Sequence, residues 1–374
     1  MKPSRNVVLL ASFSACLLWG AGCRKSTDNS SAQEAPITGK PSDPPVEMKA
    51  QWKPGRRYLM HLEMNQSMLM PWGRQPTTQE MSLGQDYAIS VTNAPDGGRG
   101  LELEIQSLAL DVGSGETTWL RFDSLNKVTP NEGPGVEQLE KLIGGRIRLL
   151  VDATNKVTNV EGVKELAARV EDTAGAAAGG RRGGRLLGGM LGPILQRIYS
   201  AEYFKQILEA GGLPQGAVRI GETWSVQKEI PGQLVGTLLL STTNKLRGWQ
   251  QREGGQCARI EFAGTLATKS GQVEGIPFGG AMKVEGGQIS GTSWFSPDLG
   301  LPVESAINQS YNVTGTLPNW GGPRRGGTNA PVRANNAPPA QFTSPVHQTI
   351  SVKLTEVPAP DPAPAPKPAG AEQK

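Results

Sequence analysis

Residues 58–70 read YLMHLEMNQSMLM, and this stretch decides the fold class. Apolar side chains occupy every second position from Tyr58 to Met64 and return at Met68 and Met70, and the polar residues His61, Glu63, Asn65 and Ser67 face the other way. Alternation over this length predicts a strand of an antiparallel sheet, with one face buried and the other in water. The buried face would carry a methionine stripe, which consists of Met60, Met64, Met68 and Met70.

The same period of two recurs further along the chain. Residues 101–105 alternate, and residues 108–112 resume the alternation one position out of phase, which predicts a β-bulge near Gln106–Ser107. Two hairpins are expected as well, one over residues 147–160 around the turn DATN and one over residues 246–262 around EGG.

Two later stretches, residues 303–313 and 350–354, continue the strand pattern. A low-complexity stretch with the sequence GGPRRGGTNAP lies between them, and we interpret residues 319–341 as a disordered loop inside the domain. The last strand follows this loop, so the chain is expected to return to the sheet before its tail begins.

Helical patterns are confined to the middle of the chain. Residues 163–173 form a short candidate helix, and residues 193–210 form a longer one that starts at a proline and stops at a glycine. A glycine-rich segment between them predicts a mobile loop. The predicted fold is therefore mainly β (α+β), an antiparallel sheet with a helical and glycine-rich insertion at about residues 163–213.

Both ends of the chain have the composition of segments that bury little surface. Residues 23–48 hold mostly Ser, Thr, Pro and charged residues, which predicts a flexible linker. Residues 358–374 alternate Pro and Ala, which is typical of an extended, disordered tail. We therefore expect one β-rich domain over residues 49–357.

The first 22 residues have the features of an export signal. Two basic residues precede the apolar run VVLLASFSACLLW at 7–19, which has secretory length and is too short to span a bilayer. The small residues GAG then lead to Cys23, and this pattern resembles the bacterial lipoprotein signal, although Gly20 stands where that family favours leucine. The resemblance implies cleavage before Cys23 and lipid on its thiol. An ordinary signal peptide, with Cys23 an incidental thiol, is the alternative.

A second resemblance lies in the body of the chain. The run VRIGETW at 218–224, the segment 142–162 and the turn DLGLP at 298–302 are similar to an uncharacterised family of β-rich exported bacterial proteins. This resemblance implies a curved antiparallel sheet or half-barrel around the central helical insertion, like that of periplasmic lipoprotein carriers. It implies no specific activity.

The titratable residues give little sign of catalysis. His61 and His347 have no cysteine or acidic residue at metal-ligand spacing in the sequence. Cys257 has only Arg259 beside it as an activating group, so a structural thiol is expected. No catalytic residue, metal site or cofactor is predicted, and we expect the protein not to be an enzyme.

One carboxylate pair is kept as a hydrolase hypothesis. Asp123 and Asp298 follow two similar turns, and they would form a site if the fold brought them together with His61. Aspartates that cap turns explain the same pattern and are more common.

Two groups of residues suggest binding instead. The methionine stripe could line an adaptable apolar groove, although plain core packing produces the same alternation. The pairs Arg181–Arg182 and Arg324–Arg325, each followed by two glycines, could contact anionic lipid, although solvated loop charge is the more common explanation. The net charge of +4, from 38 basic and 34 acidic residues, argues against a nucleic-acid partner.

The sequence therefore predicts a non-enzymatic envelope lipoprotein, anchored by acylated Cys23 to the cell membrane or outer membrane and facing the periplasm or the cell exterior. Its β-domain would bind an apolar ligand or a lipoprotein-like cargo. A structural or assembly protein that acts through envelope protein partners is the alternative, and a hydrolase is the third hypothesis.

Overall fold

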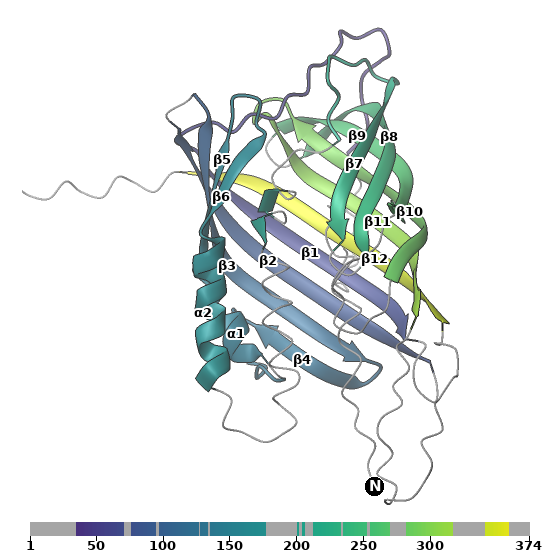
Figure 1. The fold of residues 1–374 in the computed structure, drawn as a ribbon. Helices are drawn as coiled ribbons and strands as arrows, with labels where there is room; N and C mark the ends of the chain where they lie inside the picture. The colour runs from purple at the N-terminus through teal and green to yellow at the C-terminus, as the bar shows by residue number, and fades with distance from the viewer. Residues whose placement is uncertain are drawn as a thin grey trace, which may run out of the picture.

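The computed structural model describes residues 35–70, 76–94, 97–126, 128–133, 135–176, 200–201, 204–205, 212–232, 235–252, 255–269, 282–316 and 341–358. Within these residues, twelve antiparallel strands form a single curved sheet (Figure 1). The mainly β class is thereby confirmed. The predicted loop at 319–340, the tail from residue 359 and most of the insertion between residues 177 and 211 lie outside the described residues.

The strands span most of the described chain. Their bounds are β1 (Arg57–Met70), β2 (Thr77–Asn93), β3 (Arg99–Ser114), β4 (Thr117–Asp123), β5 (Arg146–Val151), β6 (Val157–Glu161), β7 (Thr223–Gly232), β8 (Gly236–Arg252), β9 (Gly255–Thr268), β10 (Met282–Ser296), β11 (Leu301–Thr316) and β12 (Gln341–Val357). In the sheet their order is β6-β5-β3-β2-β1-β12-β11-β10-β9-β8-β7, and β4 pairs with β3 beside this path. The last strand thus lies between β1 and β11, which confirms the predicted return of the chain to the sheet.

The alternating patterns identify the buried face correctly. On β1 the side chains from Tyr58 to Met70 alternate between buried and more exposed positions. Asp86 of β2 lies opposite Ser107 of β3, and the next residue, Tyr87, lies opposite Ile105. Gln106 of β3 is therefore the extra residue of the predicted bulge. The bulge keeps the leucines on both sides of it on one buried face. Both predicted hairpins are present as β5–β6 and β8–β9.

Glycines in β9 and β10 allow neighbouring backbones to approach closely. A Cβ atom on Gly264 would lie 1.9 Å from the carbonyl oxygen of Ser241 in β8, and one on Gly291 would lie 2.1 Å from the carbonyl oxygen of Ala306 in β11. Such close approach is typical of glycines where a sheet bends sharply. We attribute the strong curl of this half of the sheet to these positions, and Figure 1 shows β7 and β8 standing over the sheet.

The curl encloses an apolar inner face. Met68 and Met70 of β1 belong to one hydrophobic cluster with Ile230 of β7 and Leu238 of β8, although β1 and β7 are far apart in the sheet order. We call the face that carries these side chains the inner face. The opposite, polar face is the outer face.

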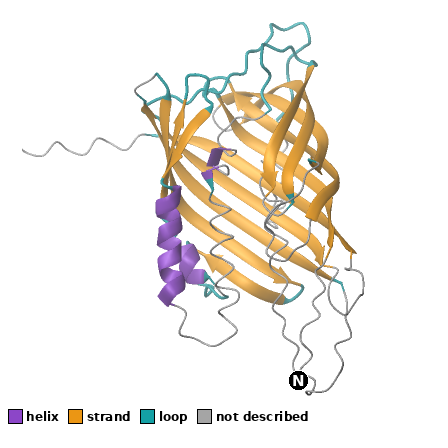
Figure 2. Cartoon of the chain, viewed as in Figure 1, coloured by secondary structure: helices purple, strands orange, loops and turns teal. Residues whose placement is uncertain are grey.

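Two helices cover part of the inner face, and they lie together beside one side of the sheet (Figure 2). They are α1 (Val136–Glu140) and α2 (Val163–Ala176), and α2 confirms the helix expected from residue 163. Leu139 of α1 and Leu166 of α2 pack in the same cluster as Leu103 of β3. The helix expected at 193–210 lies almost entirely outside the described residues. None of the described helices is long and apolar enough to cross a membrane.

The expectation of a flexible linker up to residue 48 is wrong for residues 35–48, which we call the strap. Thr38 forms an antiparallel bridge with Trp249 of β8, and Val46 forms one with Val218. The side chain of Met48 is buried in a cluster with Phe295. An isolated β-bridge does not require apolar residues at alternate positions. The polar composition of this segment therefore gave no sign that it is attached to the sheet. In Figure 1 the strap runs in purple along one end of the sheet.

Candidate functional site

Three glutamines lie side by side across the middle of the inner face, and we call them the glutamine row. Gln66 of β1 faces Gln348 of β12, which in turn faces Gln309 of β11. Their exposed fractions are only 5%, 1% and 3%, respectively. Apolar or aromatic residues flank the row on the same face, two positions before and after each glutamine. These neighbours are Met64, Met68, Val346, Ile350, Ile307 and Tyr311.

Gln348 holds the most informative atom of the glutamine row. Its Nε2 group donates to the Sδ atom of Met64 at 2.9 Å, and a thioether is only a weak acceptor. Its Oε1 atom is buried and has no hydrogen-bond partner in the described part of the chain. A buried acceptor left without a donor costs about 1–3 kcal/mol, and native proteins rarely keep one. The position is therefore suited to a group that donates a hydrogen bond.

The methionine stripe lies where the sequence placed it, on the inner face, and all four side chains are buried. Met60 and Met64 belong to the larger core cluster, whereas Met68 and Met70 belong to the cluster that includes β7 and β8. On β1, Gln66 separates the two pairs. The stripe thus contributes to core packing on both sides of the glutamine row.

Sequence reasoning missed the glutamine row, although a signal was present. Within β1 the apolar alternation skips position 66, and Gln309 falls among the apolar positions of β11. A polar residue at an inward position is the signal. Only the strand order shows that three of these positions are neighbours.

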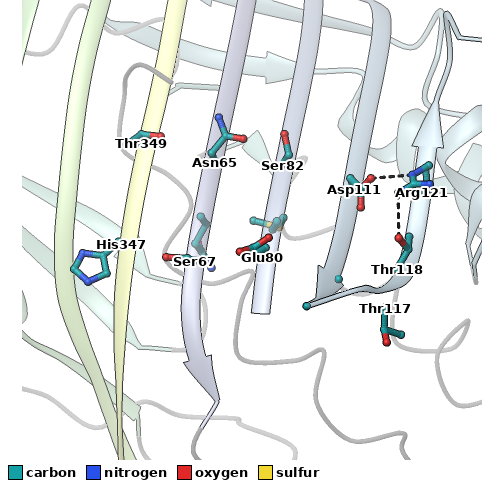
Figure 3. Close-up of a pocket in the computed structure, with 14 residues that line it drawn as sticks. Asn65, Ser67, Glu80, Ser82, Asp111, Thr117, Thr118, Arg121, His347 and Thr349 are labelled. Atoms are coloured by element: carbon teal, nitrogen blue, oxygen red, sulfur yellow. Dashed lines mark hydrogen bonds and ion pairs between the residues drawn. The ribbon is translucent and has the colours of Figure 1, made fainter. Parts of the chain in front are cut away.

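The outer face holds a polar groove of about 530 Å³. It lies beside the β3–β4 hairpin, and Asp111, Arg121, Glu80 and His347 are among its lining residues (Figure 3). Arg121 Nε donates to Asp111 Oδ2 at 2.9 Å, and this bond raises the pKa of the guanidinium above its usual value. In Figure 3 the His347 ring points towards β11, away from Glu80. The groove thus holds a neutralised ion pair and scattered polar groups rather than a catalytic arrangement.

His61 has an acidic partner that its sequence neighbours did not reveal. Its Nδ1 atom lies 2.7 Å from Asp86 Oδ1, because His61 and Asp86 are opposite each other in the β1–β2 register. The Ser107 hydroxyl donates to the other oxygen of Asp86. In a serine hydrolase the imidazole bonds to the serine, but here the carboxylate lies between the two. The arrangement therefore does not activate Ser107 as a nucleophile.

The structure does not assemble the expected carboxylate pair. Asp123 ends β4, where its Oδ1 atom accepts the backbone N–H of Leu125 at 2.9 Å. Asp298 lies in the turn between β10 and β11, so β3, β2, β1 and β12 separate the two aspartates in the sheet order. Asp123 is thus a turn cap, as the more common explanation of the pattern predicted, and the strand order gives the proposed carboxylate pair no support.

The structure describes only some of the remaining candidate site residues. Cys257 is fully buried, and its burial raises the pKa of the thiol, which leaves it in the less reactive protonated form. No group of three His, Cys, Asp or Glu side chains within the described ranges could hold a metal ion. Cys23 and the four arginines at 181, 182, 324 and 325 lie outside those ranges, so their roles stay predictions.

Comparisons with known proteins add little to this geometry. No family model and no curated protein matches the chain. A structure titled "Lipid-protein interactions in lipovitellin" is similar over 84% of this chain and 27% of its own, at 10% identity and a TM-score of 0.41. Pseudomonas aeruginosa OccK11 (OpdR) is similar over 84% of this chain and 100% of its own, at 8% identity and a TM-score of 0.14. The chain thus spans about a quarter of the length of the lipovitellin chain.

Proposed function

We propose that this protein is a membrane-anchored envelope lipoprotein whose curved sheet binds a lipid-like ligand on its inner face. The observation that carries the proposal is the glutamine row, three neighbouring buried amides that cross a mostly apolar surface. Ligand sites are typically concave and mostly apolar, with a few placed polar groups that fix the ligand's orientation. The inner face is curved and mostly apolar, and the glutamine row supplies the placed polar groups.

Core packing alone does not explain the glutamine row. A leucine at position 348 would fill a similar volume without burying an amide, and Gln348 Oε1 has no hydrogen-bond partner in the described chain. Burial of such a group lowers stability, so retaining it is consistent with a purpose other than stability. The surrounding methionines are flexible and polarisable, which suits a surface that must close around ligands of varied shape.

The first test is whether the full chain carries and takes up lipid. We expect organic extraction of the detergent-purified protein, followed by mass spectrometry, to release a lipid in near-stoichiometric amount. After delipidation, the protein should bind N-phenyl-1-naphthylamine, an apolar fluorescent probe, with saturable one-site behaviour. Absence of both the lipid and the probe signal from folded protein would contradict the proposal.

Two neighbouring residues of β11 provide matched variants for this test. Ile307 is buried on the inner face, whereas Asn308 is exposed on the outer face. Ile307→Trp should reduce probe binding by filling the inner face, and Asn308→Trp should leave it unchanged. Circular dichroism establishes that both variants are folded before binding is compared.

The membrane anchor has its own test. Cys23→Ser should move the protein from the membrane fraction to the soluble fraction, because it removes the thiol that would be lipidated. Stable anchoring needs two or more acyl chains. Cys16→Ser is the matched control, since Cys16 lies within the apolar run, and this variant should stay membrane-bound. Persistent membrane attachment of the Cys23→Ser protein would contradict the anchor.

A further inference from the structure

We infer that the ligand of the inner face is a neutral long-chain lipid with a free hydroxyl group, and that this hydroxyl donates to Gln348 Oε1. The inference rests on the proposed function and names the class of its ligand. It follows from three features of the described inner face: the unpartnered acceptor Gln348 Oε1, the lack of charge on the described residues that surround the glutamine row, and the apolar surfaces on both sides of it.

The acceptor sets the polarity of the ligand's head. One N–H of the Gln348 Nε2 group donates to Met64, whereas Gln348 Oε1 is buried without a partner in the described chain and needs an O–H or N–H group. An ionised carboxylate is an acceptor only and would leave Gln348 Oε1 without a partner. A hydroxyl donates to that atom, and its lone pairs remain available to other donors.

The surroundings exclude a charged head on physical grounds. Across the sheet, the glutamine row continues into Met81 of β2 on one side and Ile289 of β10 on the other. Both residues are buried, and neither they nor the apolar and aromatic neighbours of the row carry a charge. A carboxylate or phosphate held at this level would lose its hydration without gaining a counter-ion from these described residues. A neutral head does not meet this penalty.

The position of the glutamine row also indicates where the chain of the lipid lies. Met64, Ile350 and Ile307 lie on one side of the row, and Met68, Val346 and Tyr311 lie on the other. A hydroxyl bound at Gln348 therefore has apolar surface beside it in either direction along the strands. A long alkyl chain attached to this hydroxyl would stay on apolar surface.

Three probes of equal chain length separate these features. Oleyl alcohol carries the hydroxyl, oleate at pH 8 carries an ionised carboxylate, and 1-octadecene carries no polar group. Each is delivered from cyclodextrin to the delipidated full chain, and displacement of N-phenyl-1-naphthylamine is measured. We expect oleyl alcohol to displace the dye at a concentration about tenfold lower than octadecene or oleate, as one hydrogen bond at a buried acceptor would give.

Gln348→Leu tests the acceptor directly. This variant should bind oleyl alcohol about tenfold more weakly, bind octadecene as the wild type does, and unfold at a higher temperature when empty. Gln85→Leu is the matched control, because Gln85 is an equally buried inner-face glutamine whose Oε1 already accepts the Tyr87 hydroxyl at 2.6 Å. Gln85→Leu should lose stability and keep the preference for the alcohol.

The outcomes separate this inference from the proposed function. Equal displacement by the alcohol and the alkene in the wild type overturns the inference and leaves lipid binding intact. An unchanged preference, or a lower melting temperature, in folded Gln348→Leu also overturns it. Failure of the delipidated wild type to bind the dye and all three probes overturns the proposed function as well.

Discussion

Gly264→Ala is expected to lower the free energy of unfolding by about 3 kcal/mol, at the upper end of the usual cost of overpacking. The new Cβ would lie 1.9 Å from the Ser241 carbonyl oxygen and 2.8 Å from both Ser241 C and Thr242 Cα. All three are backbone atoms of β8, so no side chain can rotate away to make room. The added methyl group would force β8 and β9 apart and weaken the ladder between them. Urea unfolding followed by circular dichroism measures the loss.

Gly84→Ala is the matched control for this prediction. Gly84 also lies in the interior of a long strand, but a Cβ atom there would meet only Ala109 Cβ at 3.8 Å, which is an ordinary contact. We expect this variant to change the free energy of unfolding by less than about 0.5 kcal/mol, or to stabilise the fold slightly. Similar losses at both positions would show that the close approach of β8 and β9 is not what makes Gly264 necessary.

Trp294→Ala is expected to cost about 3–5 kcal/mol and to release the strap from the sheet. The Trp294 ring is buried beneath Arg252, whose Cζ atom lies 3.9 Å from the ring centroid. Its Nε1 group donates to Gln250 Oε1 at 2.6 Å, and Gln250 Nε2 donates to the Ala35 carbonyl at 2.6 Å. Loss of the ring therefore removes core packing and the group that orients Gln250 towards the strap.

Two measurements separate these contributions. Thermal denaturation reports the total loss, and limited proteolysis within residues 35–48 reports release of the strap. Trp294→Phe keeps an aromatic ring but lacks the Nε1 donor. It should lower the free energy of unfolding by only about 1–2 kcal/mol while still accelerating cleavage of the strap. If the strap of Trp294→Ala were cleaved no faster than that of the wild type, the proposed link through Gln250 would be wrong.

The elements that the sequence predicted well are those with a local signature. Alternation identifies the inner face of β1, and the phase shift between Ile105 and Leu108 places the bulge at Gln106, because each depends only on neighbours along the chain. The curvature of the sheet was also expected, but its cause was not. We attribute the curvature to glycines such as Gly264, which lies against the Ser241 carbonyl of the neighbouring strand. A contact between strands leaves no signal in the local sequence.

The features that sequence reasoning missed are all long-range. Asp86 becomes the partner of His61 through the β1–β2 register, and the glutamine row needs β12 to lie between β1 and β11. Strand order and register depend on pairings across hundreds of residues, which a period of two does not specify. The strap was missed for a different reason, because two isolated bridges leave no periodic pattern at all.

The attachment of the strap changes the reach of the domain. With Cys23 acylated as proposed, twelve residues lead from the anchor to Ala35, which Gln250 bonds to the sheet, whereas the linker was expected to run to Met48. Twelve residues fully extended cover at most about 40 Å, whereas the expected linker would have covered more than twice that distance. The end of the sheet at which the strap meets β8 would then be confined to a shallow layer above the bilayer. Confinement to such a layer raises the effective concentration of that membrane's lipids at the inner face. It disfavours transfer of a ligand to a second, distant membrane.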